Sequence, residues 1–451
     1  MATPISPARS GPSSRARGTP ANRRYELDWM RALVVLGLIP IHAAVIFSST
    51  ADVFIKNAQT SKTMALLGVF AGTWGMPLLF LVAGASAYFA LNRRTGGQYV
   101  KERAQRLLVP FIFATLLIIP LQVYAIVVSD PTLVRAFGLP IHDPAFASSY
   151  WAFYVEYLRG YVYFLTHFSP ELAIVFWGHL WFIPRLFAYA LLTLPLFFWF
   201  KSDPGQRLIT ALGRLMRYPG AIYLLALPLI ITEMLTRATH VNQLTAGWPL
   251  YDDWVQFVFF LIYYIYGYLV YAVSTMPAAI MRHGWVSLAL GVAGFALALT
   301  QSDTLTTSPF SYSLGYIAGA PIRGLVSLFW VVAVFSFAFH VLTFTNGLLR
   351  YLKEAAFPIY VLHLPIVTMV GMEVIRLDLP LLVKFVLIIV VALALTLGIF
   401  ELIVRRFRVT RVLFGLKSRP AEPVPGLSVP SWLDRWAPQA PQASGGGDRY
   451  A

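Results

Sequence analysis

Residues 380–404 read PLLVKFVLIIVVALALTLGIFELIV, and this apolar run decides the class of fold. A helix needs about 20 apolar residues to cross the hydrocarbon core of a bilayer. The run satisfies that length, and only Lys384 and Glu401 are charged within it. A membrane barrel would instead show alternating segments of about 10 residues, a pattern that the sequence lacks. The run therefore predicts a transmembrane helix.

Nine further apolar runs precede this one along the chain. The ten predicted spans are 31–49, 64–92, 107–127, 178–200, 218–236, 254–273, 284–302, 321–345, 356–375 and 380–404. Hydrophobic residues make up 58% of the 451-residue chain and charged residues only 12%, whereas soluble domains carry roughly 25% charged residues. We therefore expect an all-α polytopic membrane protein with about ten transmembrane helices.

The distribution of basic residues gives the orientation, because cytoplasmic loops carry an excess of Lys and Arg. With the N-terminus in the cytoplasm, the predicted cytoplasmic segments hold 25 of the 35 basic residues. An even number of spans returns the C-terminus to the cytoplasm. Topology and contact with anionic headgroups then account for the net charge of +15, so we expect a lipid bilayer and no nucleic acid as a partner.

The two ends of the chain differ in composition from the spans between them. Residues 1–24 are rich in Ser, Pro, Ala and Arg, and residues 416–451 are rich in Pro and Gly. We expect both to be disordered cytoplasmic tails that flank a transmembrane domain over 25–415. The chain has no cysteine, which excludes disulfides, thiolate metal sites and a cysteine nucleophile.

Ionisable side chains inside spans are costly in lipid and are therefore candidates for function. Arg31 and His42 are eleven residues apart in the first span. At about 100° per residue they share one helical face, with roughly 16 Å between them along the axis. This spacing suits a donor that enters from the cytoplasm with a charged handle and delivers a reactive group to the bilayer centre. A snorkelling Arg and a structural His explain the spacing equally well at this point.

Two further segments place polar side chains near the membrane. Residues 101–106 read KERAQR, and the guanidinium groups of Arg103 and Arg106 suit a phosphate-bearing ligand. An ordinary positive loop at the cytoplasmic face is the competing interpretation. Residues 357–365 read FPIYVLHLP and contain His363. A histidine surrounded by apolar residues in this way is more often structural than catalytic.

Segments predicted to lie toward the outer side of the membrane offer additional candidates. Arg185 lies within a predicted span and needs a partner, for which Glu233 is one choice. Residues 150–168 contain nine aromatic side chains. Aromatic rings stack on sugars, but an interfacial helix with an aromatic belt explains the same composition, and we favour the belt.

Together these segments resemble the bacterial acyltransferase 3 family of membrane proteins. Residues 25–33 (YELDWMRAL) lead to His42 with the spacing of the family's first-span signature, and 103–106 matches its Arg-x-x-Arg element. Residues 80–84 (FLVAG) resemble a family stretch that ends in Ser-Gly, except that Ala83 replaces the Ser. Residues 178–183 (GHLWFI) and 357–363 (FPIYVLH) are similar to the glucan-modifying branch.

The resemblance implies an acyltransferase that transfers groups other than aminoacyl groups. It would move an acetyl-type or succinyl-type group from a cytoplasmic acyl-CoA to a hydroxyl of an extracytoplasmic glycan or other acceptor in the cell envelope. The protein would be a multi-pass component of the inner (plasma) membrane. Acyl-CoA would be a co-substrate, and we expect no bound cofactor and no metal.

The resemblance also assigns roles to residues. His42 would be the catalytic base, since imidazole suits proton transfer near neutral pH, and Arg31 would assist it. Arg103 and Arg106 would bind the donor. The expected supporting residues are Asp28, which could orient Arg31, together with His179, Tyr360 and His363.

A secondary transporter or flippase is the alternative function, because it would also have about ten spans with intramembrane Arg and His. Such proteins are favoured by internal repeats or by broken helices at matching positions. Neither feature is clear in this sequence.

Overall fold

The computed structural model describes residues 24–49, 55–129, 149–167, 176–238, 254–300 and 314–417. Throughout these ranges the chain is helical, without a strand; the one extended feature is an isolated bridge between Ser48 and Ser61. Apart from residues 24, 416 and 417, the two predicted tails (1–24 and 416–451) lie outside the described residues.

The helices follow one another along the chain. The first half comprises α1 (Tyr25–Ile46), α2 (Lys62–Leu91), α3 (Gly96–Arg103), the π-helical turn η1 (Ala104–Leu108), α4 (Val109–Leu117), α5 (Ile119–Ser129), α7 (Tyr150–His167), the 3₁₀ turn η4 (Gly178–Trp181), α9 (Phe182–Leu192), α10 (Leu194–Trp199) and α11 (Asp203–Leu215). The second half comprises the 3₁₀ turn η5 (Ala221–Leu225), α12 (Ala226–Ala238), α13 (Trp254–Ala272), α14 (Met276–Thr300), α16 (Leu314–Val341), α17 (Gly347–Ile375), α18 (Leu381–Ile399), the π-helical turn η6 (Phe400–Val404) and α19 (Arg408–Leu413).

Seven helices in the described part are long and apolar enough to cross a membrane. They are Tyr25–Ile46, Lys62–Leu91, Gly96–Val128, Met276–Thr300, Pro321–Val341, Gly347–Ile375 and Leu381–Val404. The protein is therefore a multi-pass membrane protein, as the composition predicts. Helix is present at all ten predicted spans, but at 178–200, 218–236 and 254–273 it is shorter or broken. The count of ten stays a prediction.

The third membrane helix begins earlier than the sequence analysis predicts. The expected span is 107–127, whereas the helical stretch extends over Gly96–Val128, with a turn at Ile118. A capping box starts it: Thr95 Oγ1 accepts from the Gln98 backbone N–H, and the Gln98 side chain accepts from the Thr95 N–H. The basic segment 101–106 is therefore helical, with a π-helical turn within it, rather than a loop. Such turns are frequent at functional sites.

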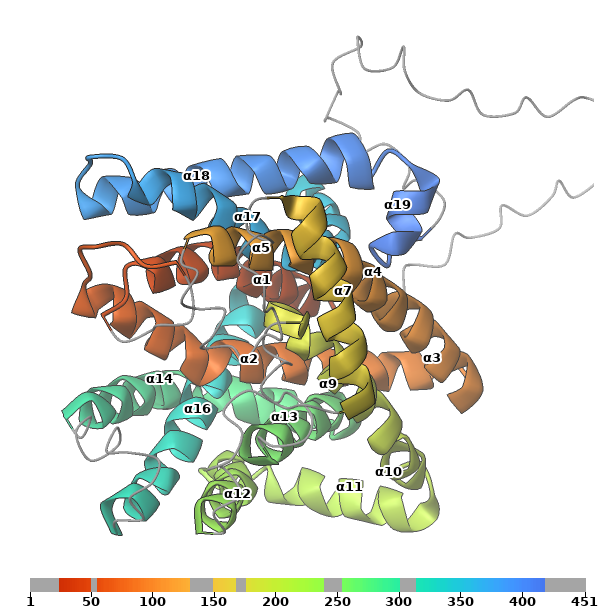
Figure 1. The fold of residues 1–451 in the computed structure, drawn as a ribbon. Coiled ribbons are helices and arrows are strands. Elements are labelled where there is room, and N and C mark those ends of the chain that lie inside the picture. Colours follow the sequence, from red (N-terminus) through yellow and green to blue (C-terminus); the bar gives the residue numbers. More distant parts are fainter. Residues whose placement is uncertain are drawn as a thin grey trace, which may run out of the picture.

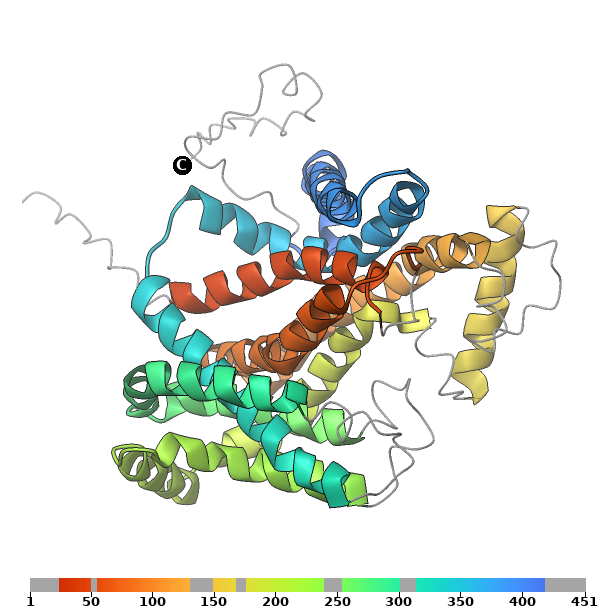
Figure 2. The same ribbon diagram turned by 90° about the vertical axis from the view of Figure 1, so that its left-hand side faces the viewer.

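The helices pack in a consistent order from one side of the molecule to the other. In both views α18 and α17 lie at the top, α1 and α2 follow below them, and α13, α14, α16 and α12 form the lower part (Figures 1 and 2). Direct packing connects α18 to α17, α17 to α1, α1 to α2, and α2 to α13. The aromatic segment forms α7, which runs at a steep angle to most of the other helices in both views. The helix α1 therefore lies between α17 and α2 in this order.

The helices α2 and α13 approach each other closely, and two glycines make this possible. A methyl group at Gly84 of α2 would overlap the backbone carbonyl oxygen of Tyr264 in α13. A methyl group at Gly267 of α13 would overlap the backbone carbonyl oxygen of Leu81 in α2. Small residues at helix interfaces allow such contact in membranes, where packing rather than hydrophobic transfer holds helices together.

We expect Gly267→Ala to lower the stability of the purified protein, although alanine favours helix by about 1 kcal/mol over glycine. The added methyl group forces α2 and α13 apart, and overpacking typically costs about 1–3 kcal/mol. Thermal unfolding in detergent measures the effect. Gly75→Ala is the matched control, because no atom lies within 4 Å of a methyl group at that position. Equal melting temperatures for the two variants would contradict the proposed role of Gly267.

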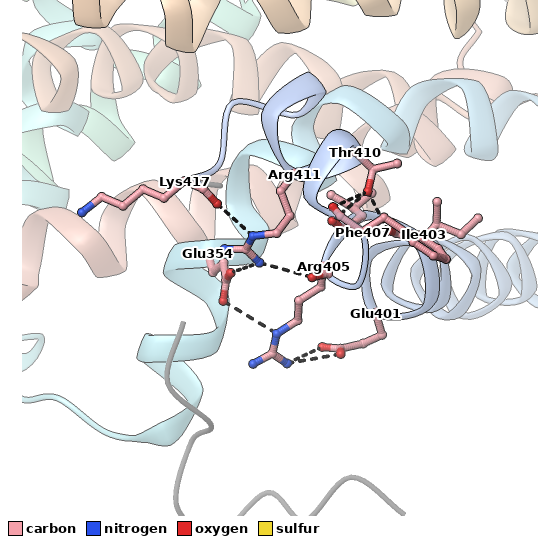
Figure 3. Close-up of polar contacts among 9 residues, drawn as sticks. Glu354, Glu401, Ile403, Arg405, Phe407, Thr410, Arg411 and Lys417 are labelled. Atoms are coloured by element: carbon pink, nitrogen blue, oxygen red, sulfur yellow. Dashed lines mark hydrogen bonds and ion pairs between the residues drawn. The ribbon is translucent and has the colours of Figure 1, made fainter. Parts of the chain in front are cut away.

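A cluster of ion pairs formed by Glu354, Glu401, Arg405 and Arg411 connects the end of the described chain to α17 (Figure 3). Arg411 of α19 is 3% exposed, and its Nη1 lies 2.7 Å from Glu354 Oε1 of α17. Arg405 lies 3.8 Å from the other oxygen of Glu354 and 3.1 Å from Glu401. Arg411 Nε also donates to the Lys417 carbonyl oxygen at 2.9 Å. The cluster thus holds α19 against α17, the helix that carries His363.

Candidate active site

The first span carries the two residues that the sequence analysis places on one face. In α1, His42 is partly buried, and its Nδ1 lies 2.8 Å from the carbonyl oxygen of Leu38, one turn earlier. A carbonyl oxygen can only accept a hydrogen bond, so Nδ1 carries the proton in the neutral ring. This leaves the lone pair on Nε2, the form of imidazole that can take a proton from a substrate.

Three imidazole rings lie in a row, with His363 between His42 and His179. The ring centroid of His42 lies 5.0 Å from that of His363 in α17, and the His363 centroid lies 4.9 Å from that of His179 in η4. His363 is fully buried, and His179 is 8% exposed. The two residues that the sequence marks as supporting candidates therefore lie beside His42, although they come from segments far apart in the chain.

Backbone contacts fix the orientation of the two buried rings. His363 Nδ1 lies 2.7 Å from the Tyr360 carbonyl oxygen. His179 Nε2 lies 3.1 Å from the same oxygen and 3.2 Å from that of Val361. The Tyr360 hydroxyl in turn donates to the His179 carbonyl oxygen at 2.6 Å. These contacts of Tyr360 hold η4 against α17 and fix the orientation of the His179 and His363 rings.

Arg31 lies toward the start of α1, away from the imidazole rings. Its Nη2 donates to Ser86 Oγ of α2 at 2.8 Å, and its Nη1 lies 4.0 Å from Asp28. Asp28 also lies 3.4 Å from Lys353 Nζ of α17. Asp28 is therefore placed between two cations, in reach of Arg31 as expected. Ser86 was not predicted as a site residue; it stands three residues beyond the position where Ala83 replaces the expected Ser.

The two arginines after the second span have different surroundings. Arg103 Cζ lies 5.1 Å from the centroid of the Tyr99 ring, and the guanidinium is close enough to Arg31 for their charges to repel. Arg106 is more exposed, and its Nη2 lies 2.9 Å from Glu102 Oε1. The structure therefore brings Arg103 toward Arg31 and turns Arg106 toward an acidic partner.

Two tyrosines that the sequence analysis did not single out stand behind Arg103. The hydroxyls of Tyr99 and Tyr264 lie 2.9 Å apart, and both side chains are almost fully buried. Tyr264 belongs to α13, at its close contact with Gly84. No local pattern marks these residues, because the contact depends on how α3 and α13 pack. Two neighbouring guanidinium groups with a hydroxyl pair behind them form a site suited to an anion.

Arg185 and Glu233, expected as possible partners, each contact other residues. Arg185 of α9 is 2% exposed, and its Cζ lies 4.8 Å from the Trp181 ring centroid and 5.8 Å from that of Phe260. Glu233, proposed as a partner of Arg185, lies 3.1 Å from Arg323 Nε of α16. Among the residues that the structure describes, no group of three or more His, Cys, Asp or Glu side chains is arranged to hold a metal ion.

Comparisons with known proteins agree with these features. A family profile described as an acyltransferase domain matches residues 24–401. The chain is 24% identical over 360 residues to a protein named glucans biosynthesis protein C from Salmonella paratyphi B, and 25% identical over 366 residues to the protein of that name from Salmonella heidelberg. Each alignment covers 78% of this chain and 84% of the relative. No solved structure matches the chain significantly.

Proposed function

The chain belongs to the acyltransferase 3 family of membrane proteins, and on this basis we propose that it transfers an acyl group from a cytoplasmic acyl-CoA to a hydroxyl of an extracytoplasmic glycan. The family membership confirms the acyltransferase interpretation over the transporter alternative. What we propose beyond the family membership is the identity of the donor, the class of acceptor and the roles of the individual residues. The observation that carries them is His42, which lies on the same helix as Arg31, uses Nδ1 for a backbone contact and packs against the buried imidazole of His363.

Acyl transfer at this site needs one group that accepts a proton and one group that binds the anionic part of the donor. In the proposed step, the acceptor oxygen attacks the thioester carbonyl carbon while its proton passes to His42 Nε2. The carbon–sulfur bond breaks, the new ester forms, and the CoA sulfur takes the proton back from the imidazolium. Direct attack of this kind fits a chain with no cysteine.

The arginines are proposed to hold the donor. Arg31 and Arg103 are like charges in the same part of the site, so an anion that binds to both would be favourable, and CoA supplies phosphates that accept charge-assisted hydrogen bonds. Arg106 would extend this site at its rim. Asp28 would orient Arg31, and Tyr360 would position the imidazoles.

The direction of two helices supports the predicted topology of ten spans with both termini in the cytoplasm. Asp28 pairs with Lys353 near the starts of α1 and α17, and His42 meets His363 further along both. The helices therefore run in the same direction, which requires an odd number of crossings between them. Four of the seven long helices lie between them, and four is an even number, so at least one shorter helix must cross as well. With ten spans, seven of them would lie between α1 and α17, which is an odd number as the parallel direction requires.

The acceptor and the membrane follow from the relatives. Proteins named for glucan biosynthesis match most of this chain, so we propose a glucan-type saccharide of the cell envelope as the acceptor and the inner membrane as the location. The acyl group would be of the acetyl or succinyl type, giving O-acetylation or its succinyl equivalent. No bound cofactor enters the proposed step.

A transfer assay tests the proposed function. Membrane vesicles containing the protein would receive labelled acetyl-CoA or succinyl-CoA on the cytoplasmic face and a gluco-oligosaccharide on the other. We expect a labelled ester of the oligosaccharide, identified by mass, that is absent from vesicles without the protein. Failure to form any acylated saccharide from either donor would contradict the proposed donor and acceptor classes.

A further inference from the structure

Three buried polar atoms near the imidazole rings lack a hydrogen-bond partner among the described residues. They are His179 Nδ1, His363 Nε2 and Gln122 Oε1. All three side chains are more than nine-tenths buried, with exposures of 8%, 0% and 4%. Buried polar atoms in proteins almost always have partners, so three orphaned atoms in one region need an explanation.

All three orphaned atoms are hydrogen-bond acceptors. His179 uses Nε2 to donate to backbone carbonyl oxygens, so its Nδ1 carries only a lone pair in the neutral ring. His363 uses Nδ1 in the same way, so its Nε2 carries a lone pair. The Gln122 atom is an amide oxygen. A ligand that satisfied them must bring donors, and a carboxylate or a phosphate brings none.

Gln122 comes from α5, and two observations place it next to the imidazoles. Its Oε1 lies 4.0 Å from the position that a Cβ would occupy on Gly178, the residue before His179. Gly178 has a φ of +49°, a conformation that glycine adopts at least cost, and it makes the tight turn that presents His179. In addition, α5 packs directly against α17, the helix of His363. The acceptors therefore come from three separate segments, α5, η4 and α17, which pack against one another near the imidazole rings.

We infer that His179 Nδ1, His363 Nε2 and Gln122 Oε1 form a subsite for the hydroxyl groups of a polyhydroxylated acceptor, with Gln122 as a residue that selects for it. The inference rests on the proposed acyl transfer and deepens it. Neighbouring hydroxyls of a sugar would donate to these atoms while the reacting hydroxyl faces His42 Nε2. An acceptor with one isolated hydroxyl would leave buried acceptors unsatisfied, so the subsite discriminates against it.

The decisive variant is Gln122→Met, which keeps the length of the side chain and removes the acceptor oxygen. With a gluco-oligosaccharide as the acceptor probe, we expect the KM for the saccharide to rise about 3- to 20-fold, the size expected for one lost hydrogen bond. The KM for acyl-CoA should not change. Gln59→Met is the matched control, because Gln59 is exposed and its hydrogen bond with Asn57 Nδ2 is made by its backbone carbonyl oxygen. Gln122→Glu, which keeps an oxygen at this position, should recover part of the loss.

A second measurement uses the wild-type protein and does not depend on how a variant folds. The unmodified oligosaccharide should bind to the purified protein without any acyl donor, as followed by calorimetry, whereas its per-O-methyl ether should not bind or compete. Equal binding of the two saccharides, or an unchanged saccharide KM in Gln122→Met, would overturn the subsite. Loss of transfer in the wild type with retained saccharide binding would instead contradict the proposed reaction and leave the subsite supported.

Discussion

Replacing His42 by alanine should abolish acyl transfer and leave the protein folded and able to bind acyl-CoA. The Nε2 lone pair is proposed to act only as the acceptor hydroxyl loses its proton, so its removal raises the barrier without weakening donor binding. Losing proton transfer alone typically lowers turnover by about 10²–10⁴-fold. The measurement is the rate of labelled acyl transfer at saturating donor, together with calorimetric binding of acyl-CoA.

The chain offers a matched control for this variant. His340 lies at the end of α16 and also has its Nδ1 2.8 Å from the carbonyl oxygen four residues earlier, but it is exposed. His340→Ala therefore removes the same ring and the same backbone contact away from the proposed site, and it should leave turnover unchanged. Wild-type turnover in His42→Ala would remove His42 from the mechanism, whereas equal loss in both variants would indicate a general effect on structure.

The part of the site that lies within one helix was predictable from the sequence. Arg31 and His42 are eleven residues apart, and helical geometry alone puts them on one face. Asp28 is three residues before Arg31, and the structure places their charges 4.0 Å apart. Spacing of this kind needs only the knowledge that the segment is a helix.

Contacts between helices were not predictable in the same way. His179 and His363 appeared in the sequence as separate candidates, and nothing local indicates that both rings lie beside His42. Ser86 and Gln122 are single polar residues in apolar helices, and their roles depend on which helix packs against them. A single sequence contains no signal for such pairing.

The fold shows the same division between local and tertiary information. Apolar runs located helix at every predicted span, because the length of a run and its lack of charge are local properties. The start of the third membrane helix was wrong by about ten residues, since the polar segment 96–106 carries no hydropathy signal and is helical through its capping box and π-helical turn. Breaks within the shorter spans also depend on packing.

The donor site gives the second large expected effect, and the structure ranks the two arginines that the sequence treats alike. Arg103 lies over the Tyr99 ring and is close enough to Arg31 for their charges to interact, whereas Arg106 is exposed and paired with Glu102. Arg103→Ala should weaken acyl-CoA binding by about 1.5–3 kcal/mol, the range for hydrogen bonds to charged groups, which is roughly a 10- to 150-fold rise in Kd.

Arg106→Ala is the matched comparison and should have a smaller effect, within about 1 kcal/mol, because an exposed ion pair contributes little and solvent screens the charge. Calorimetric titration of each purified variant with acyl-CoA measures the two values directly. Raising the salt concentration should reduce the effect of Arg106→Ala more than that of Arg103→Ala, since screening is strongest for exposed charges. If the two variants bind acyl-CoA as the wild type does, the anion between Arg31 and Arg103 is not the donor. If Arg106→Ala has the larger effect, the phosphates lie at the exposed rim, and Arg103 serves mainly to hold Tyr99 and Tyr264 in place.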